Sequence, residues 1–129
     1  MIFLDTNVLL DVLRTDVVFA QRSARAINSA ARRAIGPVVY AELAAGFPNQ
    51  ADLDAVLSRM SVDVYPMSRV SLFLAGQAYV SYRRRGGPRE QLLPDFLIGA
   101  QATIEGIAII TRDPRRYRTA FPELQVLEP

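Results

Sequence analysis

The sequence predicts an α/β fold in which a mostly parallel sheet is covered by helices on both faces. The main observation is that short apolar runs of strand type alternate along the chain with longer segments of helical spacing. A second observation is size, because 129 residues, half of them apolar, can form a core without disulfides or a structural metal. No repeat or linker-like stretch divides the chain, so we expect one domain over residues 1–129.

In the first third of the chain, a strand is expected over Met1–Leu4, where the residues are apolar. Helical spacing follows over Asn7–Leu13 and again over Asp16–Arg33, where Thr15 or Asp16 is available as the N-cap. A short strand over Ala34–Gly36 then leads into Pro37–Ala45. Proline suits the first position of a helix and Gly46 suits its end, so this segment is expected to be helical.

The remaining elements alternate in the same way. Helical spacing predicts a helix over Asn49–Arg59, and alternating valines predict a strand over Ser61–Tyr65 that stops at Pro66. The Gly86-Gly87-Pro88 sequence closes a long helix that starts at Ser68 and ends at Arg85. The last elements are expected to be a helix over Pro94–Glu105, a strand over Ala108–Thr111, a helical turn after Pro114 and a strand over Leu124–Leu127.

The composition excludes several kinds of chemistry. The chain has no histidine and no cysteine, so Ser-His-Asp catalysis, imidazole acid–base chemistry, thiolate metal sites and disulfides are excluded. All fifteen basic residues are arginine, which leaves no lysine for a Walker-type phosphate site or a Schiff base. If the chain is an enzyme, its polar chemistry must therefore come from carboxylates, hydroxyls, arginine and backbone groups, and we expect a metal to assist them.

Charge and hydropathy favour a cytoplasmic protein that is able to bind polyanions. The formal net charge is +2 and the isoelectric point is about 9.4, a mild basic bias that permits nucleic-acid binding. No apolar run approaches the length of roughly 18–20 residues that a bilayer span requires. Met1 is followed directly by the first strand with no basic leader, so we expect neither a membrane association nor an export signal.

Four acidic residues occupy the positions where a parallel α/β sheet binds ligands, which lie beyond the carboxyl ends of its strands. Asp5 directly follows the first strand, and Asp113 follows the run Ile109–Thr111 after one residue. Glu42 lies on the helix that leaves the second strand, and Asp95 lies in the first turn of its helix. Each has an ordinary structural explanation as well, as a helix N-terminal acid, a turn residue or an exposed helix residue.

Taken together, these four acids favour a metal site. Carboxylates that converge within a few ångströms repel one another, and a divalent cation relieves the repulsion. Mg²⁺ and Mn²⁺ prefer carboxylate and water oxygens, and such an ion activates water for the hydrolysis of phosphate esters. With no histidine or lysine in the chain, a metal-activated water is the expected nucleophile.

At these residues the sequence resembles the PIN-domain ribonucleases, and in its length and order of elements it is similar to VapC-type toxins of type II toxin–antitoxin pairs. Four segments, spread over nearly the whole chain, carry the resemblance. They are Asp5-Thr6-Asn7, Val39-Tyr40-Ala41-Glu42-Leu43, Pro94-Asp95-Phe96-Leu97-Ile98-Gly99-Ala100 and Thr111-Arg112-Asp113.

The resemblance implies a Rossmann-like three-layer α/β/α domain with strand order 3-2-1-4-5 and an Mg²⁺- or Mn²⁺-dependent endoribonuclease activity. It makes Asp5 and Asp95 the main metal contacts, with Glu42 and Asp113 acting partly through water. Hydrogen bonds from three supporting residues would hold these carboxylates, namely Thr6, Asn7 and Thr111. One departure is Gly99, which lacks the additional acid that some relatives carry there and so weakens the case for a second metal ion.

Arginines near these acids are candidates for contacts with RNA phosphates. Arg112, Arg115, Arg116 and Arg118 crowd the segment after Asp113, and we predict that the first three bind substrate. Arg83–Arg85 and Arg89 flank the glycine turn and are as readily explained as a solvated surface. The arginines of the segment 22–33 are expected to form an ordinary polar helix face; they are Arg22, Arg25, Arg32 and Arg33.

Two apolar stripes on the helix Ser68–Arg85 suggest that one of them is a partner surface. One contains Val70, Phe73, Leu74 and Val80, and the other contains Leu72, Ala75, Tyr79 and Tyr82. Burial of both within one chain is an equally good explanation. Similar proteins form homodimers and are silenced by an antitoxin, so the resemblance implies a homodimer and a VapB-like partner. The groove for that partner is expected to include Val12, Leu13, Val17, Val18 and Phe19.

Other function classes fit less well. A haloacid-dehalogenase-type phosphatase or a receiver domain needs a lysine, and the phosphatase also needs an aspartate at Asn7. Dinucleotide binding needs a Gly-x-Gly-x-x-Gly sequence that does not follow the first strand. A metal-dependent nuclease acting on DNA and a non-catalytic PIN-like binding module remain open as alternatives.

Overall fold

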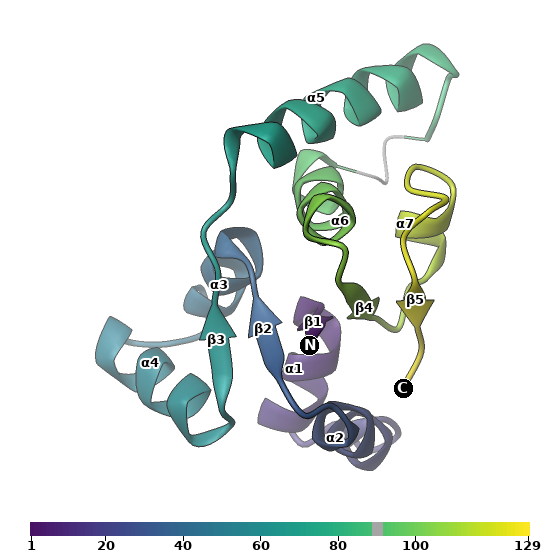
Figure 1. Ribbon diagram of the computed structural model, residues 1–129. Helices are drawn as coiled ribbons and strands as arrows, with labels where there is room; N and C mark the ends of the chain where they lie inside the picture. The colour runs from purple at the N-terminus through teal and green to yellow at the C-terminus, as the bar shows by residue number, and fades with distance from the viewer. Residues whose placement is uncertain (89–91) are drawn as a thin grey trace.

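The computed structural model describes residues 1–88 and 92–129, and within them a single sheet forms the centre of the fold. All strand pairs are parallel, and the order is β3-β2-β1-β4-β5, so the predicted α/β class and the order 3-2-1-4-5 are confirmed. Figure 1 shows the strands side by side, from β3 at the left to β5 at the right. They are β1 (Ile2–Leu4), β2 (Arg33–Ile35), β3 (Val62–Val64), β4 (Ala108–Ile110) and β5 (Val126–Leu127).

Helices cover both faces of this sheet. The chain runs from β1 to β2 and β3 in one direction across the sheet, then crosses back to β4 and β5 in the other. Because parallel crossovers are right-handed, the helices that connect β1, β2 and β3 lie on one face, and the helices that lead to β4 and β5 lie on the opposite face. The first group is α1 (Thr6–Leu13), α2 (Ala20–Ser29), α3 (Pro37–Ala44) and α4 (Gln50–Arg59), and the second is α5 (Arg69–Arg84), α6 (Leu93–Glu105) and α7 (Arg115–Arg118). None of the helices in the described ranges is long and apolar enough to cross a membrane.

The core is formed where both helical layers meet the central strands. All three residues of β1 are buried, as are Ile109 and Ile110 of β4, which is the pattern of parallel strands covered on both sides. On the second face, α5 lies along α6, as Figure 1 shows at the top of the molecule, and α6 also contacts α7. Among the buried polar residues, Asp5 and Thr111 directly follow β1 and β4 at the carboxyl end of the sheet.

The predicted helix Asp16–Arg33 is too long, because α2 comprises only Ala20–Ser29. Asp16 does act as a cap, since its carboxylate accepts hydrogen bonds from the backbone N–H groups of Val18 and Phe19 at 2.9 and 2.8 Å, but the capped segment is a turn that precedes the helix. At the other end, Ala30 is extended, and Arg33 belongs to β2, where it pairs with Ile2.

The second and third strands are fixed to α6 by a close contact. A Cβ atom on Gly36 would lie 1.7 Å from the amide oxygen of Gln101, so a larger residue here would displace this side chain. Gln101 is buried and donates hydrogen bonds to the carbonyl oxygens of Tyr65 and Pro66, both at 3.3 Å. The segment after β3 is therefore tied to α6, which carries one of the predicted site residues.

The two predicted stripes of α5 differ in burial. Ala75 is fully buried, and Tyr79 and Tyr82 pack against Phe96 of α6 with ring centroids 5.4 and 5.3 Å apart, so this stripe faces the core. Two residues depart from the prediction: Leu74 also packs inward, whereas Leu72 of the buried stripe is 46% exposed. The outward stripe therefore consists of Val70, Phe73 and Val80, which are 63%, 71% and 43% exposed.

Candidate active site

The strand register brings Asp5 and Thr111 together. Leu4 of β1 pairs with Ile110 of β4, and the backbone N–H of Asp5 donates to the carbonyl of Ile110 at 3.0 Å. The next residue of each strand, Asp5 in one and Thr111 in the other, therefore lies at the same carboxyl edge of the sheet. Helices leave β1 and β4 toward opposite faces here, which is the switch point where open α/β sheets bind ligands.

Asp5 is held in one orientation by three donors. The backbone N–H of Thr6 donates to its Oδ1 at 2.8 Å, and the hydroxyls of Thr111 and Tyr117 donate to its Oδ2 at 2.7 and 2.9 Å. Burial, followed by the charge of Asp5 and the hydrogen bond to it, raises the pKa of Tyr117, so the phenol stays protonated as a donor. Asp5 is 1% exposed, and its Oδ1 accepts one hydrogen bond whereas its Oδ2 accepts two.

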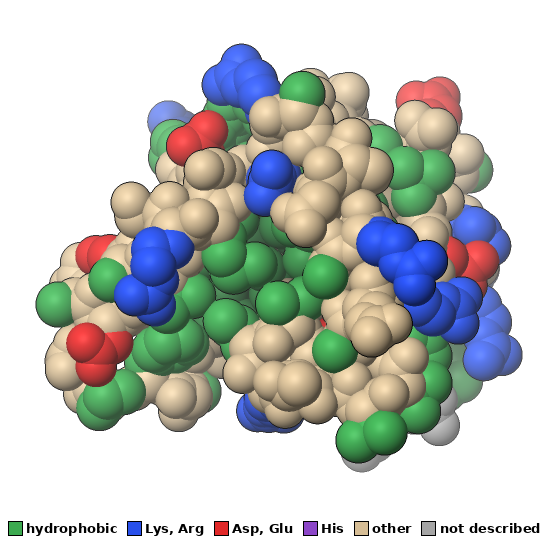
Figure 2. Space-filling model, turned by 90° about the horizontal axis from the view of Figure 1, so that it is seen from below, with side chains coloured by type: hydrophobic (Ala, Val, Ile, Leu, Met, Phe, Trp, Pro, Cys, Tyr) green, Lys and Arg blue, Asp and Glu red, His purple; other side chains and the backbone are tan. Residues whose placement is uncertain are grey.

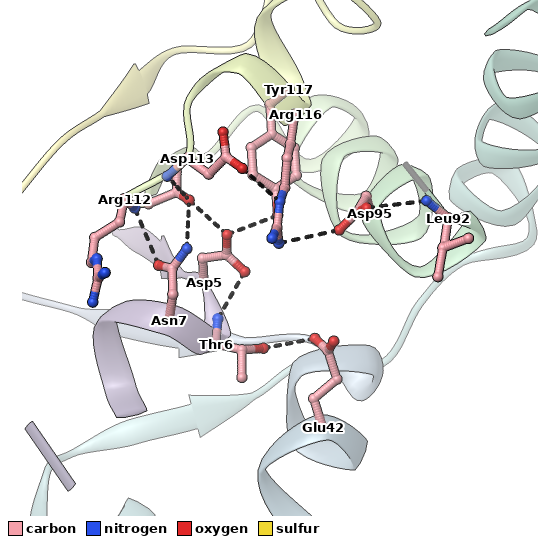
Figure 3. A network of polar contacts seen from close by, with 11 residues as sticks. Asp5, Thr6, Asn7, Glu42, Leu92, Asp95, Arg112, Asp113, Arg116 and Tyr117 are labelled. Atoms are coloured by element: carbon pink, nitrogen blue, oxygen red, sulfur yellow. Dashed lines mark hydrogen bonds and ion pairs between the residues drawn. The ribbon is translucent and has the colours of Figure 1, made fainter. Parts of the chain in front are cut away.

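Asn7 and Thr111 connect Asp5 to the loop after β4. The amide nitrogen of Asn7 donates to the Thr111 hydroxyl oxygen at 3.3 Å, and its amide oxygen accepts from the backbone N–H of Arg112 at 3.1 Å. The backbone N–H of Asp113 also donates to the Thr111 hydroxyl, at 3.0 Å. This network, drawn in Figure 3, fixes the backbone that carries Asp113 relative to Asp5.

Asp95 and Asp113 approach the same region from α6 and from the loop after β4. Figure 3 shows their carboxylates facing the guanidinium of Arg116, which also lies near Asp5. The Nε of Arg116 donates to Oδ2 of Asp113 at 3.0 Å, and its NH1 group donates to Oδ1 of Asp95 at 3.4 Å. We call Asp5, Asp95 and Asp113 the acid cluster.

The acid cluster is electrostatically strained at Asp95. This side chain is 15% exposed, and its second oxygen accepts the backbone N–H of Leu92 at 3.2 Å. Burial raises the pKa of Asp95, and the negative charges of Asp5 and Asp113 raise it further, against the lowering effects of Arg116 and the Leu92 hydrogen bond. A site with this balance favours any cation that approaches it.

Glu42 lies at the margin of the site. It is exposed on α3, and its Oε1 accepts a hydrogen bond from the Thr6 hydroxyl at 2.7 Å, so it is connected to Asp5 only through Thr6. Of the four predicted acids, Asp95 and Asp113 bond to Arg116 and Asp5 lies beside it. The fourth, Glu42, is separated from Asp5 by Thr6. Across residues 1–88 and 92–129, no three acidic side chains already surround a single point that would hold a metal ion.

The donor chemistry nevertheless suits a hard divalent cation. The groups that converge are carboxylate oxygens and hydroxyls, with no nitrogen or sulfur ligand among them. A cationic group already bridges two of the carboxylates, which indicates that the cluster needs positive charge. Oxygens of Asp5, Asp95 and Asp113 are the ones that would hold the ion.

Arg112 is directed away from the acid cluster. Its guanidinium forms an ion pair with Asp11 and lies 4.0 Å from the centre of the Phe19 ring. Asp11 is 3% exposed and also accepts the Ser23 hydroxyl at 2.6 Å. The sequence interpretation missed this buried pair, although Asp11 lies one helical turn after Asn7 on an otherwise apolar helix, and that spacing is a usable signal.

Tyr117 is a second site residue that the sequence did not reveal. Its hydroxyl reaches Asp5 because Gly99 leaves room for its ring. A Cβ atom at position 99 would lie 2.4 Å from the ring of Phe121 and 3.0 Å from the ring of Tyr117. Only glycine lets α7 and the segment after it pack this close to α6. A larger side chain, an acid included, would displace these rings, so position 99 contributes packing around Tyr117 and no carboxylate.

Several arginines surround a cavity beside the acid cluster. The cavity measures about 510 Å³ and is lined by Arg14, Arg112, Arg115 and Arg116 together with Asp113. In the view from below in Figure 2, arginines form several separate groups, the largest toward the side where β5 and α7 lie in Figure 1. Arg118 instead bonds to the carbonyl of Val126, Arg83 contacts Tyr79, and Arg89 lies outside the described residues.

The fold and the site together define a class. This is an open, all-parallel α/β domain whose acidic residues gather at the switch point of the sheet. Residues 2–122 match the family model described as PIN domain, so the chain belongs to the PIN domain family and the predicted membership is confirmed. A comparison with curated proteins finds none that matches in sequence.

Solved structures show the same fold at low identity. A chain in the structure of VapBC2 from Rickettsia felis bound to a promoter DNA fragment superposes with a TM-score of 0.75 and 21% identity, over 100% of this chain and 99% of that one. A chain of VapBC-1 from nontypeable Haemophilus influenzae gives 0.74 and 20%, over 99% and 98%. A chain of FitAcB from Neisseria gonorrhoeae gives 0.73 and 21%, over 98% and 96%.

Proposed function

We propose that this chain is an Mg²⁺- or Mn²⁺-dependent endoribonuclease and the toxin of a type II toxin–antitoxin pair. The observation that carries the proposal is the gathering of three carboxylates at the switch point of a PIN-family sheet, where Asp95 and Asp113 bond to one guanidinium and Asp5 lies beside it. The similarity of the fold to chains in VapBC structures supports the toxin assignment. Hydrolysis of a phosphodiester bond is the reaction that such an oxygen-only site performs best.

Asp5 and Asp95 would be the principal ligands of the ion. When bound, the cation would lower the pKa of a water molecule and offset the charge that develops on the phosphate. Asp5 is suited to this because three donors fix its carboxylate and only one of them bonds to Oδ1. Asp95 is suited because its burial leaves its charge poorly solvated. Residues that hold a ligand in place, as Thr6, Thr111 and Tyr117 hold Asp5, strongly affect the affinity of metal sites.

Asp113 and Glu42 would act from the periphery. Asp113 is 42% exposed at its side chain, so it can reach water as well as the cluster. Glu42 is exposed and is oriented by the Thr6 hydroxyl. From this position it would act through a bound water rather than by direct contact with the ion. Both can accept a proton from water at the open side of the site.

The substrate backbone would bind along the arginine-lined cavity. Arg115 is exposed and Arg116 is 42% exposed at its side chain, so both can contact phosphates next to the acid cluster. The sequence also predicts that Arg112 binds substrate. Because Arg112 forms an ion pair with Asp11, it would instead mainly hold the loop after β4 in place. RNA backbone contacts of this kind make binding sensitive to salt.

Cleavage of a defined single-stranded RNA and of a DNA strand with the same sequence tests the activity. Wild type, Asp95→Asn and the control Asp63→Asn, which changes an exposed acid on β3, are purified free of any partner and incubated with Mg²⁺, Mn²⁺ or EDTA. We expect wild type and Asp63→Asn to cleave RNA only with metal and Asp95→Asn to match the EDTA control.

The other outcomes would reject parts of the proposal. Equal cleavage by Asp95→Asn would exclude the acid cluster as the active site. Preferential cleavage of DNA would make the chain a deoxyribonuclease. Inactivity of the wild type on both strands, with no Mn²⁺ binding in calorimetry, would favour a non-catalytic binding module.

An antitoxin and a second copy of the chain are the proposed partners. Val17 and Val18, exposed by 101% and 68% just before α2, would belong to the antitoxin surface, and the outward stripe of α5 would form the homodimer. Light scattering should give twice the chain mass of 14.3 kDa, and Phe73→Asp should give a monomer, whereas Ile104→Asp on α6 should remain dimeric. A wild-type monomer would refute the dimer.

For the antitoxin, co-expression with the adjacent reading frame should give a complex that Val18→Asp weakens. Isolation of the chain without that product would contradict the pairing. Phe73→Asp serves as the matched control, because it changes an exposed apolar residue on a different surface and should leave the complex intact.

A further inference from the structure

Arg116 lies among the carboxylates that the proposed function assigns to a metal. Its guanidinium bridges Asp113 and Asp95, at 3.0 and 3.4 Å, and Figure 3 shows it between these two side chains and beside Asp5. An arginine side chain keeps its positive charge at any pH at which a protein stays folded. The guanidinium is therefore a permanent cation within the acid cluster.

A divalent cation would need the same oxygens. Arg116 bonds to Oδ1 of Asp95 and Oδ2 of Asp113, and the other oxygen of Asp95 accepts the backbone N–H of Leu92. The guanidinium and the ion carry like charges, so they repel each other when both lie against the same carboxylates. Because both bind the same groups, occupancy by one reduces occupancy by the other.

The structure offers Arg116 a second place. Its side chain also lines the cavity of about 510 Å³ in which Arg14 and Arg115 lie. Its side chain is 42% exposed, so the core does not enclose the guanidinium. A phosphate in the cavity would favour that position, since it would replace the carboxylates as the partner of the guanidinium.

We propose that Arg116 is an internal counterion that competes with the divalent cation for the acid cluster and turns into the adjoining cavity when the cation binds. The inference rests on the proposed function, because it requires the cluster to bind a metal. It makes Arg116 a residue that sets metal affinity and connects metal binding to contact with the nucleic-acid backbone. Neutralisation of Arg116 should therefore strengthen metal binding, and by more than the loss of one positive charge beside the cluster would do by itself.

Titration of the nucleic-acid-free chain with Mn²⁺ in a calorimeter tests this without measuring cleavage. Wild type is compared with Arg116→Gln and with Arg115→Gln, which removes the same charge from the neighbouring residue. If the guanidinium occupies the cluster about nine-tenths of the time, Arg116→Gln should bind Mn²⁺ about tenfold more tightly than wild type. Arg115→Gln should change the affinity by less than about threefold, the effect of net charge alone.

A second measurement follows the side chain itself. The Nε–H signal of Arg116 is assigned by its loss in Arg116→Gln, and diamagnetic Mg²⁺ is then added to wild type. Release from Asp113 should shift this signal and speed its exchange with solvent, while the Nε–H signal of Arg25 on α2 should not change.

Each result either supports or overturns the inference. Wild-type binding of Mn²⁺ with an equal or weaker affinity in Arg116→Gln would overturn the inference and leave the proposed function intact. An Nε–H signal of Arg116 that does not respond to saturating Mg²⁺ would do the same. Failure of both wild type and Arg116→Gln to bind Mn²⁺ would overturn the metal-dependent function, and the inference with it.

Discussion

Substitution of Gly99 by alanine is the most direct test of how this fold positions its candidate site. The added Cβ would lie 2.4 Å from the Phe121 ring and 3.0 Å from the Tyr117 ring. Phe121 cannot easily yield, because it is 2% exposed and packs against Phe96 with ring centroids 6.4 Å apart. The strain must therefore move α7 away from α6 and draw the Tyr117 hydroxyl away from Asp5.

The magnitude follows from a comparison with Gly76. A methyl group forced into a packed core costs about 1–3 kcal/mol. Alanine also gains about 0.5–1 kcal/mol over glycine inside a helix. A Cβ at Gly76, in the middle of α5, meets no atom within 4 Å, so Gly76→Ala should show the helical gain alone. The difference between the two variants is then the packing cost.

Urea unfolding followed by circular dichroism measures that difference. With a slope of about 2 kcal/mol per M, the midpoint of Gly99→Ala should lie about 0.5–1.5 M below that of Gly76→Ala. Gly76→Ala should unfold at or above the wild-type midpoint. Equal midpoints for the two variants would refute the account in which Gly99 exists to admit the α7 aromatic side chains.

Three further predictions concern the polar groups of the site. Tyr117→Phe should lower the free energy of unfolding by about 1.5–3 kcal/mol in urea, because a charged Asp5 loses a hydrogen bond, and an unchanged value would exclude that role. Arg112→Ala should cost about 3 kcal/mol or less, since it strands the buried Asp11 but Arg112 itself is 34% exposed, and a neutral effect in the same assay would contradict the pairing. The pKa of Asp95 is raised, so its stabilising contribution is full below the ordinary value of 3.8 and is lost as pH rises through the raised value. Asp95→Asn should therefore be more stable than wild type at about pH 7, with a gain that disappears near about pH 3.5, and a gain that is independent of pH would contradict the shift.

The positions of Asp5 and Asp113 could be predicted because both residues follow the ends of strands. Asp5 follows an apolar run, and in a parallel sheet the carboxyl ends of neighbouring strands share an edge. The register that places Asp5 beside Thr111 follows from this topology. Arg116 could be located near Asp113 by its position in the sequence, but nothing in the sequence indicated that its guanidinium bridges two carboxylates.

The remaining features depend on tertiary packing that local patterns do not encode. Tyr117 reaches Asp5 only because Gly99 leaves room for the α7 aromatic residues, a contact between segments far apart in the chain. Arg33 follows alanine-rich sequence that favours a helix, yet its pairing with Ile2 makes it part of β2. With only three residues, Arg-Ala-Ile, β2 also shows no alternation that would separate it from the helix before it.

The central claim is that the acid cluster is the metal site of this PIN-family chain, and Mn²⁺ calorimetry on nucleic-acid-free protein tests it most directly. Wild type and the control Asp63→Asn should each show one saturable binding event. Asp95→Asn should bind at least about tenfold more weakly, with its fold verified by circular dichroism. Equal affinity in all three proteins, or no binding by wild type, would contradict the account.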